Sequence, residues 1–177
     1  TGERTPHPDP LARGAFVGLT VRHRLGHMAR AVMEGVVLEI RDILEQWNEA
    51  DLGVQCLRIG GGATRSALWN QIQADVYGRA VETLRVGEST ALGAALLGGV
   101  GAGVFASIEE GVAAMVHVAD RIEPDPERHD RYEELYRAYV QTYEGLSSSG
   151  AFDALARVAA RLLPDDPEIL GLMDRRR

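Results

Sequence analysis

A strand pattern that runs directly into three glycines and then into a helix constrains this chain more than any other feature. Residues 54–59 alternate apolar and polar side chains, and glycines occupy positions 60–62. Apolar side chains then recur at helical spacing over residues 66–77, where Ser66 is placed to cap the helix and Gly78 to end it. A strand, a tight turn and a helix in this order are typical of α/β folds.

The same junction is the best candidate for a binding site. Glycines allow a ligand to approach the main chain without a Cβ in the way, and the N-terminus of the following helix favours an anion. A nucleotide phosphate or ribose would suit such a turn. The dinucleotide fingerprint G-x-G-x-x-G is not met, because Arg65 stands where the third glycine belongs. A tight turn that binds nothing is the alternative interpretation, and the residues alone leave both open.

Apolar periodicity predicts two further strands and several helices. The strands are expected at residues 14–20 and 80–84, and the helices at residues 27–48, 90–100, 108–118, 127–144 and 151–163. Residues 1–13 are expected to form an irregular loop and residues 147–150 a linker. Since strands alternate with helices, we expect an α/β fold with a largely parallel sheet.

The longest predicted helix, residues 27–48, carries one apolar stripe. The stripe consists of Met28, Val32, Val36, Ile40, Ile43 and Trp47. The charged residues Arg30, Glu34, Arg41 and Glu45 fall largely off it. Such a pattern is typical of an amphipathic helix whose charged side is solvated.

The composition excludes several classes of function. All 19 Lys and Arg residues of the 177-residue chain are Arg, so the chain contains no Lys. P-loop and Schiff-base sites both need a Lys, so neither is present on this chain. The net charge of −7 argues against a nucleic-acid partner. The single Cys56 cannot form an internal disulfide, which favours a reducing compartment such as the cytoplasm, and no apolar stretch reaches the ~18 residues of a membrane span.

Other patterns point to structure more than to chemistry. The glycine cluster at residues 98–103 follows a predicted helix and is expected to end it. The small residues Ala91, Gly93, Ala94 and Ala95 form a helix face suited to close packing. His23 and His27 have a spacing that some metal sites use, but Gly26 interrupts any helix there, so His27 is better explained as a helix-start residue. We find no complete catalytic constellation and predict no catalytic or metal-binding residue on this chain.

Four motifs in order resemble the FGGY carbohydrate kinases. They are Gly14-Ala-Phe-Val-Gly-Leu-Thr20 with His27-Met-Ala-Arg-Ala-Val-Met-Glu-Gly35, then Arg58-Ile-Gly-Gly-Gly-Ala63, then Leu68-Trp-Asn-Gln-Ile-Gln-Ala-Asp75, and Glu88-Ser-Thr-Ala-Leu-Gly-Ala-Ala95. The opening Gly2-Glu-Arg-Thr-Pro-His7 is similar to the xylulokinase branch of this family. The resemblance covers residues 2 to about 105 and continues less specifically to about residue 143.

The resemblance implies an actin-like, ribonuclease-H-like ATPase lobe that binds ATP with Mg²⁺. It implies that the nucleotide lies against Gly60, Gly61, Gly62, Ala63 and Ser66. The reaction would transfer the γ-phosphoryl group of ATP to a ketose hydroxyl, with D-xylulose as the first candidate substrate. Ribulose, glycerol, gluconate and fuculose are the alternatives within the family, and a non-catalytic actin-like nucleotide-binding module is the alternative outside it.

The resemblance also implies what this chain does not carry. The sugar site and the catalytic Asp of the family belong to an N-terminal lobe, so we expect a fragment that is inactive alone, with a homodimer left open. We expect residues 1–145 to form part of the nucleotide-binding lobe and residues 146–177 a linker with a helical tail. Without the first strands of that lobe, the strands at residues 14–20 and 54–59 would expose unpaired edges.

Overall fold

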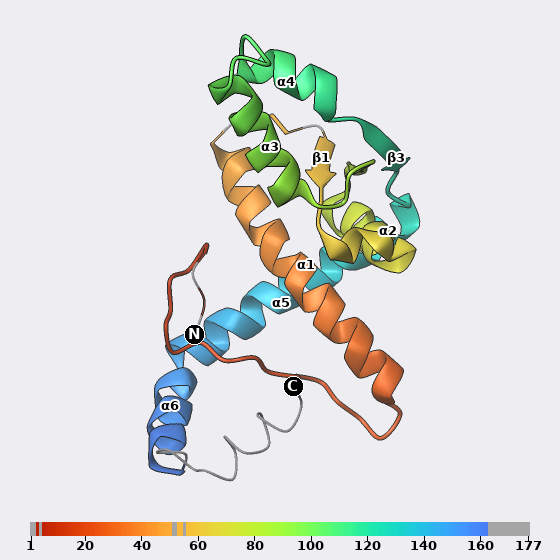
Figure 1. Ribbon diagram of the computed structural model, residues 1–177. Coiled ribbons are helices and arrows are strands. Elements are labelled where there is room, and N and C mark those ends of the chain that lie inside the picture. Colours follow the sequence, from red (N-terminus) through yellow and green to blue (C-terminus); the bar gives the residue numbers. More distant parts are fainter. Residues whose placement is uncertain (1–2, 4, 51–52, 55, 163–177) are drawn as a thin grey trace. The chain divides into compact units, whose positions relative to one another are not determined.

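The structure, a computed structural model, describes residues 3, 5–50, 53, 54 and 56–162 (Figure 1). The chain divides into two compact units. One is His23–Tyr136, and the other combines Thr1–Arg22 with Arg137–Arg177. The first of these units holds the candidate site.

The first unit contains the sheet and most of the helices. In order these are α1 (Leu25–Glu49), β1 (Cys56–Ile59), the 3₁₀ turn η1 (Gly62–Arg65), α2 (Ala67–Tyr77), β2 (Ala80–Leu84), α3 (Ser89–Gly101), α4 (Ile108–Met115), β3 (Val118–Ile122) and the start of α5 (Pro126–Ser148). The other unit contains the remainder of α5 and α6 (Ala151–Leu162).

The sheet has the strand order β1-β2-β3, with β1 parallel and β3 antiparallel to β2. The parallel β1–β2 pair confirms part of the sequence prediction. The strand β3 was not predicted. Its side chains follow the same apolar and polar order as those of β2, and its pairing with β2 is a long-range contact. Arg58, Glu82 and Arg121 lie side by side across the three strands and form two ion pairs, at 3.1 and 3.0 Å.

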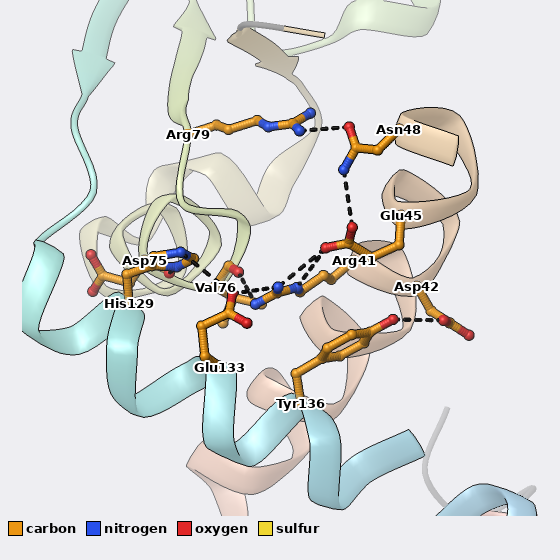
Figure 2. A network of polar contacts seen from close by, with 10 residues as sticks. All are labelled: Arg41, Asp42, Glu45, Asn48, Asp75, Val76, Arg79, His129, Glu133 and Tyr136. Carbon is orange, nitrogen blue, oxygen red and sulfur yellow. Dashed lines mark hydrogen bonds and ion pairs between the residues drawn. The ribbon is translucent and has the colours of Figure 1, made fainter. Parts of the chain in front are cut away.

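The core of this unit lies between α1, α2 and β2. Its largest fully buried side chains are Ile72, Val37, Val76 and Val81. Beside this core, the buried guanidinium of Arg41 joins three helices (Figure 2). It donates to the Val76 carbonyl of α2 at 3.0 Å and to Glu133 of α5 at 2.5 Å, and it lies 4.4 Å from the ring centre of Tyr136. These contacts fix the C-terminal end of α2, whose other end forms the candidate site.

Several helix boundaries follow the sequence prediction because their signals are local. The Ser66 and Ser107 hydroxyls accept hydrogen bonds from Trp69 and Glu110 backbone N–H groups, so both serines are N-caps as predicted. Gly78 ends α2 in the left-handed conformation, with φ of +61°. The glycine cluster at 98–103 ends α3, again as predicted. α1 begins at Leu25, so Gly26 lies in its first turn and does not interrupt the helix, contrary to the prediction. His27 lies in the same turn and accepts the Arg24 N–H at 3.0 Å, which confirms it as a helix-start residue.

The strand predicted at residues 14–20 is wrong. These residues form no helix or strand, and Phe16, Val17 and Leu19 are exposed. A strand is stable only when a neighbouring strand pairs with it, and β1, β2 and β3 pair only with one another within the described part of the chain. Residues 14–20 therefore have the apolar composition of a strand, but no neighbouring strand pairs with them among the described residues.

The apolar stripe predicted for α1 does not face the core. Val32, Val36, Ile40 and Trp47 are exposed, whereas Val37, Leu38, Arg41 and Leu44 are buried. The solvated side predicted for Glu34 and Arg41 is also wrong. Glu34 accepts the hydroxyl of Tyr132 at 2.7 Å, and Arg41 is 6% exposed. The neighbouring elements pack on the side of α1 next to the predicted apolar stripe. On that side the guanidinium of Arg41 has hydrogen-bond partners in α2 and α5.

Two other boundaries differ from the prediction. The fourth helix ends at Met115, because Val116 adopts an extended conformation and the chain continues into β3. The linker predicted at 147–150 is half helical, since α5 continues to Ser148 and the chain then turns at residues 149 and 150, where Gly150 has a φ of +72°. Serines inside a helix cost little, whereas a glycine with positive φ ends one.

The second unit is organised around Tyr143 of α5. Its ring stacks on His7 at 5.4 Å and lies 6.1 Å from the ring of Phe152 in α6. Burial, followed by the Glu3 carboxylate, raises the pKa of Tyr143. Among the described residues no helix has the length and apolar character needed to cross a membrane.

Candidate functional site

The turn after β1 contains three consecutive glycines, Gly60, Gly61 and Gly62, which differ in what surrounds them. A Cβ on Gly60 would lie 2.7 Å from Ser89 Oγ, so this glycine permits close contact with the start of α3. Gly61 has a φ of +88° and open space where a Cβ would stand. Gly62 begins η1, and a Cβ there would lie 3.1 Å from Nη2 of Arg65. Gly61 and Gly62 thus expose main chain that a ligand can approach.

A second loop lies beside this turn. The loop after β2 leads to α3, and the Gly61 N–H donates to the Gly87 carbonyl in that loop at 2.9 Å. Two parallel neighbouring strands therefore direct their following loops to one place, at their carboxyl ends. In open α/β sheets ligands bind at this edge.

The turn is also held from the side of α2. The hydroxyl of Thr64 donates to the Gly61 carbonyl at 2.8 Å, and the Asn70 amide donates to the Thr64 carbonyl at 2.8 Å. Sequence reasoning missed Thr64, Asn70 and Gly87. Asn70 was the available signal for the turn contacts. It is a polar residue of low helix propensity on the buried side of a helix, which suggests a hydrogen-bonding role.

The predicted binding residues lie together in the turn because they are adjacent in sequence. Gly62, Ala63 and Ser66 are exposed and Gly61 is half-buried. The Ser66 oxygen accepts the Trp69 N–H at 3.2 Å, which leaves its O–H able to donate to a ligand. Gly60 differs from the others, because its missing side chain makes room for Ser89. Ligand contact at these five positions stays a prediction.

The small face of α3 is open in this structure. Ala91, Gly93, Ala94 and Ala95 are exposed, and a Cβ on Gly93 would meet nothing within 4 Å. Its close packing therefore stays a prediction.

The turn offers main-chain groups, hydroxyls and one arginine, which suit binding more than proton transfer. Arg65 is exposed and donates to the Gly62 carbonyl at 3.3 Å. At the start of β1, burial and then the Glu82 carboxylate raise the pKa of the Cys56 thiol, which lowers its reactivity. Within the described ranges, no three His, Cys, Asp or Glu side chains gather as a metal site would require.

Comparisons with known proteins agree on one family. Residues 1–102 match the C-terminal domain of the FGGY family of carbohydrate kinases. A xylulose kinase of Staphylococcus epidermidis is 36% identical over 143 residues, which cover 81% of this chain and 29% of the relative. A glycerol kinase of Solidesulfovibrio magneticus is 44% identical over 131 residues, covering 73% and 26% respectively.

A solved structure agrees with this assignment. The crystal structure of xylulose kinase from Rhodospirillum rubrum superposes with a TM-score of 0.67 at 34% identity, over 79% of this chain and 28% of that one. The chain thus spans less than a third of the length of these relatives. The small mixed sheet with its helices is the actin-like, ribonuclease-H-like ATPase fold. By sequence and by fold, the chain belongs to the FGGY family of carbohydrate kinases.

Proposed function

We propose that this chain forms the nucleotide-binding wall of an ATP-dependent sugar kinase that converts D-xylulose to D-xylulose 5-phosphate. The observation that carries the proposal is the turn at residues 60–66, at the carboxyl edge of two parallel strands in a chain of this family. The xylulose kinase relatives, which match about four fifths of the chain, support D-xylulose as the first sugar to test.

The geometry of the turn fits a nucleotide. A Cβ on Gly61 would meet nothing within 4 Å, and one on Gly62 would meet Nη2 of the exposed Arg65 at 3.1 Å. The Ser66 hydroxyl can donate to a nitrogen or oxygen of the base or ribose. When bound, ATP supplies the phosphoryl group and leaves as ADP. The residues of this chain would bind and orient it, and such positioning carries much of the catalysis in phosphoryl transfer.

We assign neither a catalytic base nor a Mg²⁺ ligand to this chain. Since no residue is assigned to accept the proton of the sugar hydroxyl, transfer would need groups outside these residues. We therefore expect the 177 residues alone to phosphorylate no sugar.

Glycerol is the second candidate substrate. The glycerol kinase relative shares 44% identity over 131 residues, which is higher than the 36% of the xylulose kinase over its longer match. Coupled ADP release from the intact protein, measured with D-xylulose, glycerol, D-ribulose, gluconate and L-fuculose, would rank the sugars. ATP binding without turnover of any of them would instead favour a non-catalytic module.

Substitution of Gly62 tests the nucleotide site directly. A Gly62→Val change places a branched side chain beside Arg65 and over the open main chain. We expect the Kd for ATP to rise at least about tenfold, with sugar affinity unchanged, in calorimetric titrations of the intact protein.

Gly145→Val is the matched control, because a Cβ on this α5 glycine meets nothing within 4 Å and lies outside the turn. ATP binding by Gly62→Val equal to that of this control would exclude the turn as the nucleotide site.

A further inference from the structure

Three hydrogen bonds connect the interior of α2 to the loop after β2. The Asn70 amide Nδ2 donates to the Thr64 carbonyl, the Thr64 hydroxyl donates to the Gly61 carbonyl, and the Gly61 N–H donates to the Gly87 carbonyl. Their donor–acceptor distances are 2.8, 2.8 and 2.9 Å. We call this series the turn relay. It joins one buried side chain to the main chain at Gly61.

Stability does not explain Asn70. The residue is 6% exposed inside a helix, and its Oδ1 has no hydrogen-bond partner among the described residues. A buried polar atom left unpaired costs stability, and asparagine is a poorer helix former than leucine. A leucine of similar shape would avoid the unpaired Oδ1 but would not donate to the Thr64 carbonyl. What the amide supplies is a donor aimed at the turn.

Gln73 provides an internal comparison. It lies one turn further along α2, is 5% exposed and also has a buried amide atom, Nε2, without a partner. Its side-chain oxygen accepts the hydroxyl of Tyr77 at 3.4 Å. Asn70 and Gln73 are thus alike in burial and chemistry, but only Asn70 donates to the turn.

We propose that Asn70 and Thr64 are positioning residues for nucleotide binding. They hold the glycine turn in its open shape before the ligand arrives, so that less conformational freedom is lost on binding. This inference rests on the proposed function, since it concerns the same turn. It assigns affinity for the nucleotide to two residues that need not touch it.

Isosteric substitutions separate this role from a structural one. Thr64→Val removes the hydroxyl donor and keeps the shape, whereas Thr64→Ser keeps the donor. Asn70→Leu removes the amide, and Gln73→Met removes the matched amide away from the turn. We expect Thr64→Val and Asn70→Leu to raise the Kd for ATP about five- to tenfold. Thr64→Ser and Gln73→Met should stay within about twofold of the parent.

The measurements are made on the intact protein. Calorimetry gives the Kd for ATP and for the sugar, and denaturation gives Tm for each variant. A positioning role raises the Kd or KM for ATP and leaves the sugar constant unchanged, even where Asn70→Leu and Gln73→Met shift Tm alike.

The outcomes distinguish the two proposals. If the parent binds ATP and Gly62→Val weakens binding, but Thr64→Val and Asn70→Leu bind like Gln73→Met, the relay has no role and the proposed function stands. If the parent does not bind ATP, or Gly62→Val binds like its control, the proposed function fails and the relay proposal fails with it. Should Asn70→Leu not fold, the comparison of Thr64→Val with Thr64→Ser decides alone.

Discussion

Gly78 ends α2 directly against a histidine ring. Its φ is +61°, and a Cβ there would lie 2.5 Å from Cε1 of His129. The ring cannot easily withdraw, because Nδ1 lies 2.9 Å from the Asp75 carbonyl and Nε2 lies 3.4 Å from a Glu133 oxygen. One missing side chain therefore sets how closely α2 and the start of α5 approach.

Gly78→Ala should consequently lower the free energy of unfolding by about 3 kcal/mol, from backbone strain together with the clash. Gly103→Ala is the matched control, since Gly103 has a φ of +73° but open space around its Cβ position, and should lose only about 1 kcal/mol. Urea denaturation measures both. Equal losses would show that the His129 ring imposes no constraint, and a His129→Ala background should remove the difference between them.

At the scale of elements, a buried arginine determines how α1 meets α2 and α5. Arg41 supplies a donor to the Val76 carbonyl at the end of α2 and to carboxylates of Glu45 and Glu133 (Figure 2). Tyr136, beneath the guanidinium, donates its hydroxyl to Asp42 at 2.7 Å. Burial and then that carboxylate raise the pKa of Tyr136. The helices thus meet through polar contacts as well as through the apolar core.

Replacing Arg41 by Met keeps much of the apolar stem but leaves the Val76 carbonyl without its donor. We expect a loss of about 2–4 kcal/mol in the free energy of unfolding, because a buried acceptor loses its partner along with two ion pairs. Arg58→Met breaks an ion pair on the exposed face of the sheet and should change stability little. Comparable destabilisation of the two variants in chemical denaturation would argue against a special role for Arg41.

For the molecule as a whole, β1 is the edge strand at the parallel side of the sheet. Within the described residues, β1 pairs only with β2, whereas β2 pairs on both sides. The open side of β1 presents unpaired main-chain groups, and such edges pair with other strands and promote association.

Hydrogen exchange on the 177-residue chain should reveal this edge. On β1, the amides that point toward β2 should be protected and the alternate amides should exchange quickly, while β2, with neighbours on both sides, serves as the internal control. Protection of every amide in Cys56–Ile59 in a monomer would mean that another segment covers the edge.

Much of the candidate site could be predicted from the sequence because its signals are local. Ser66 and Gly78 bound α2 through hydrogen bonds and a backbone conformation that involve only neighbouring residues. Residues 80–84 were predicted as a strand, and β2 has the same bounds in the structure. The glycines and the capping serine that form the turn lie within residues 60–66, so their proximity needed no knowledge of the rest of the fold.

Local patterns in the amino-acid chain predicted the order of most helices, the turn between β1 and α2, and the family. Long-range packing determines that Arg41 is buried, that residues 118–122 form a strand, that residues 14–20 do not, and that Asn70 and Thr64 hold the turn. The physical reason is the same for each. Strand pairing and the burial of a polar side chain depend on partners that lie far away in sequence, whereas caps and turns are satisfied within a few residues.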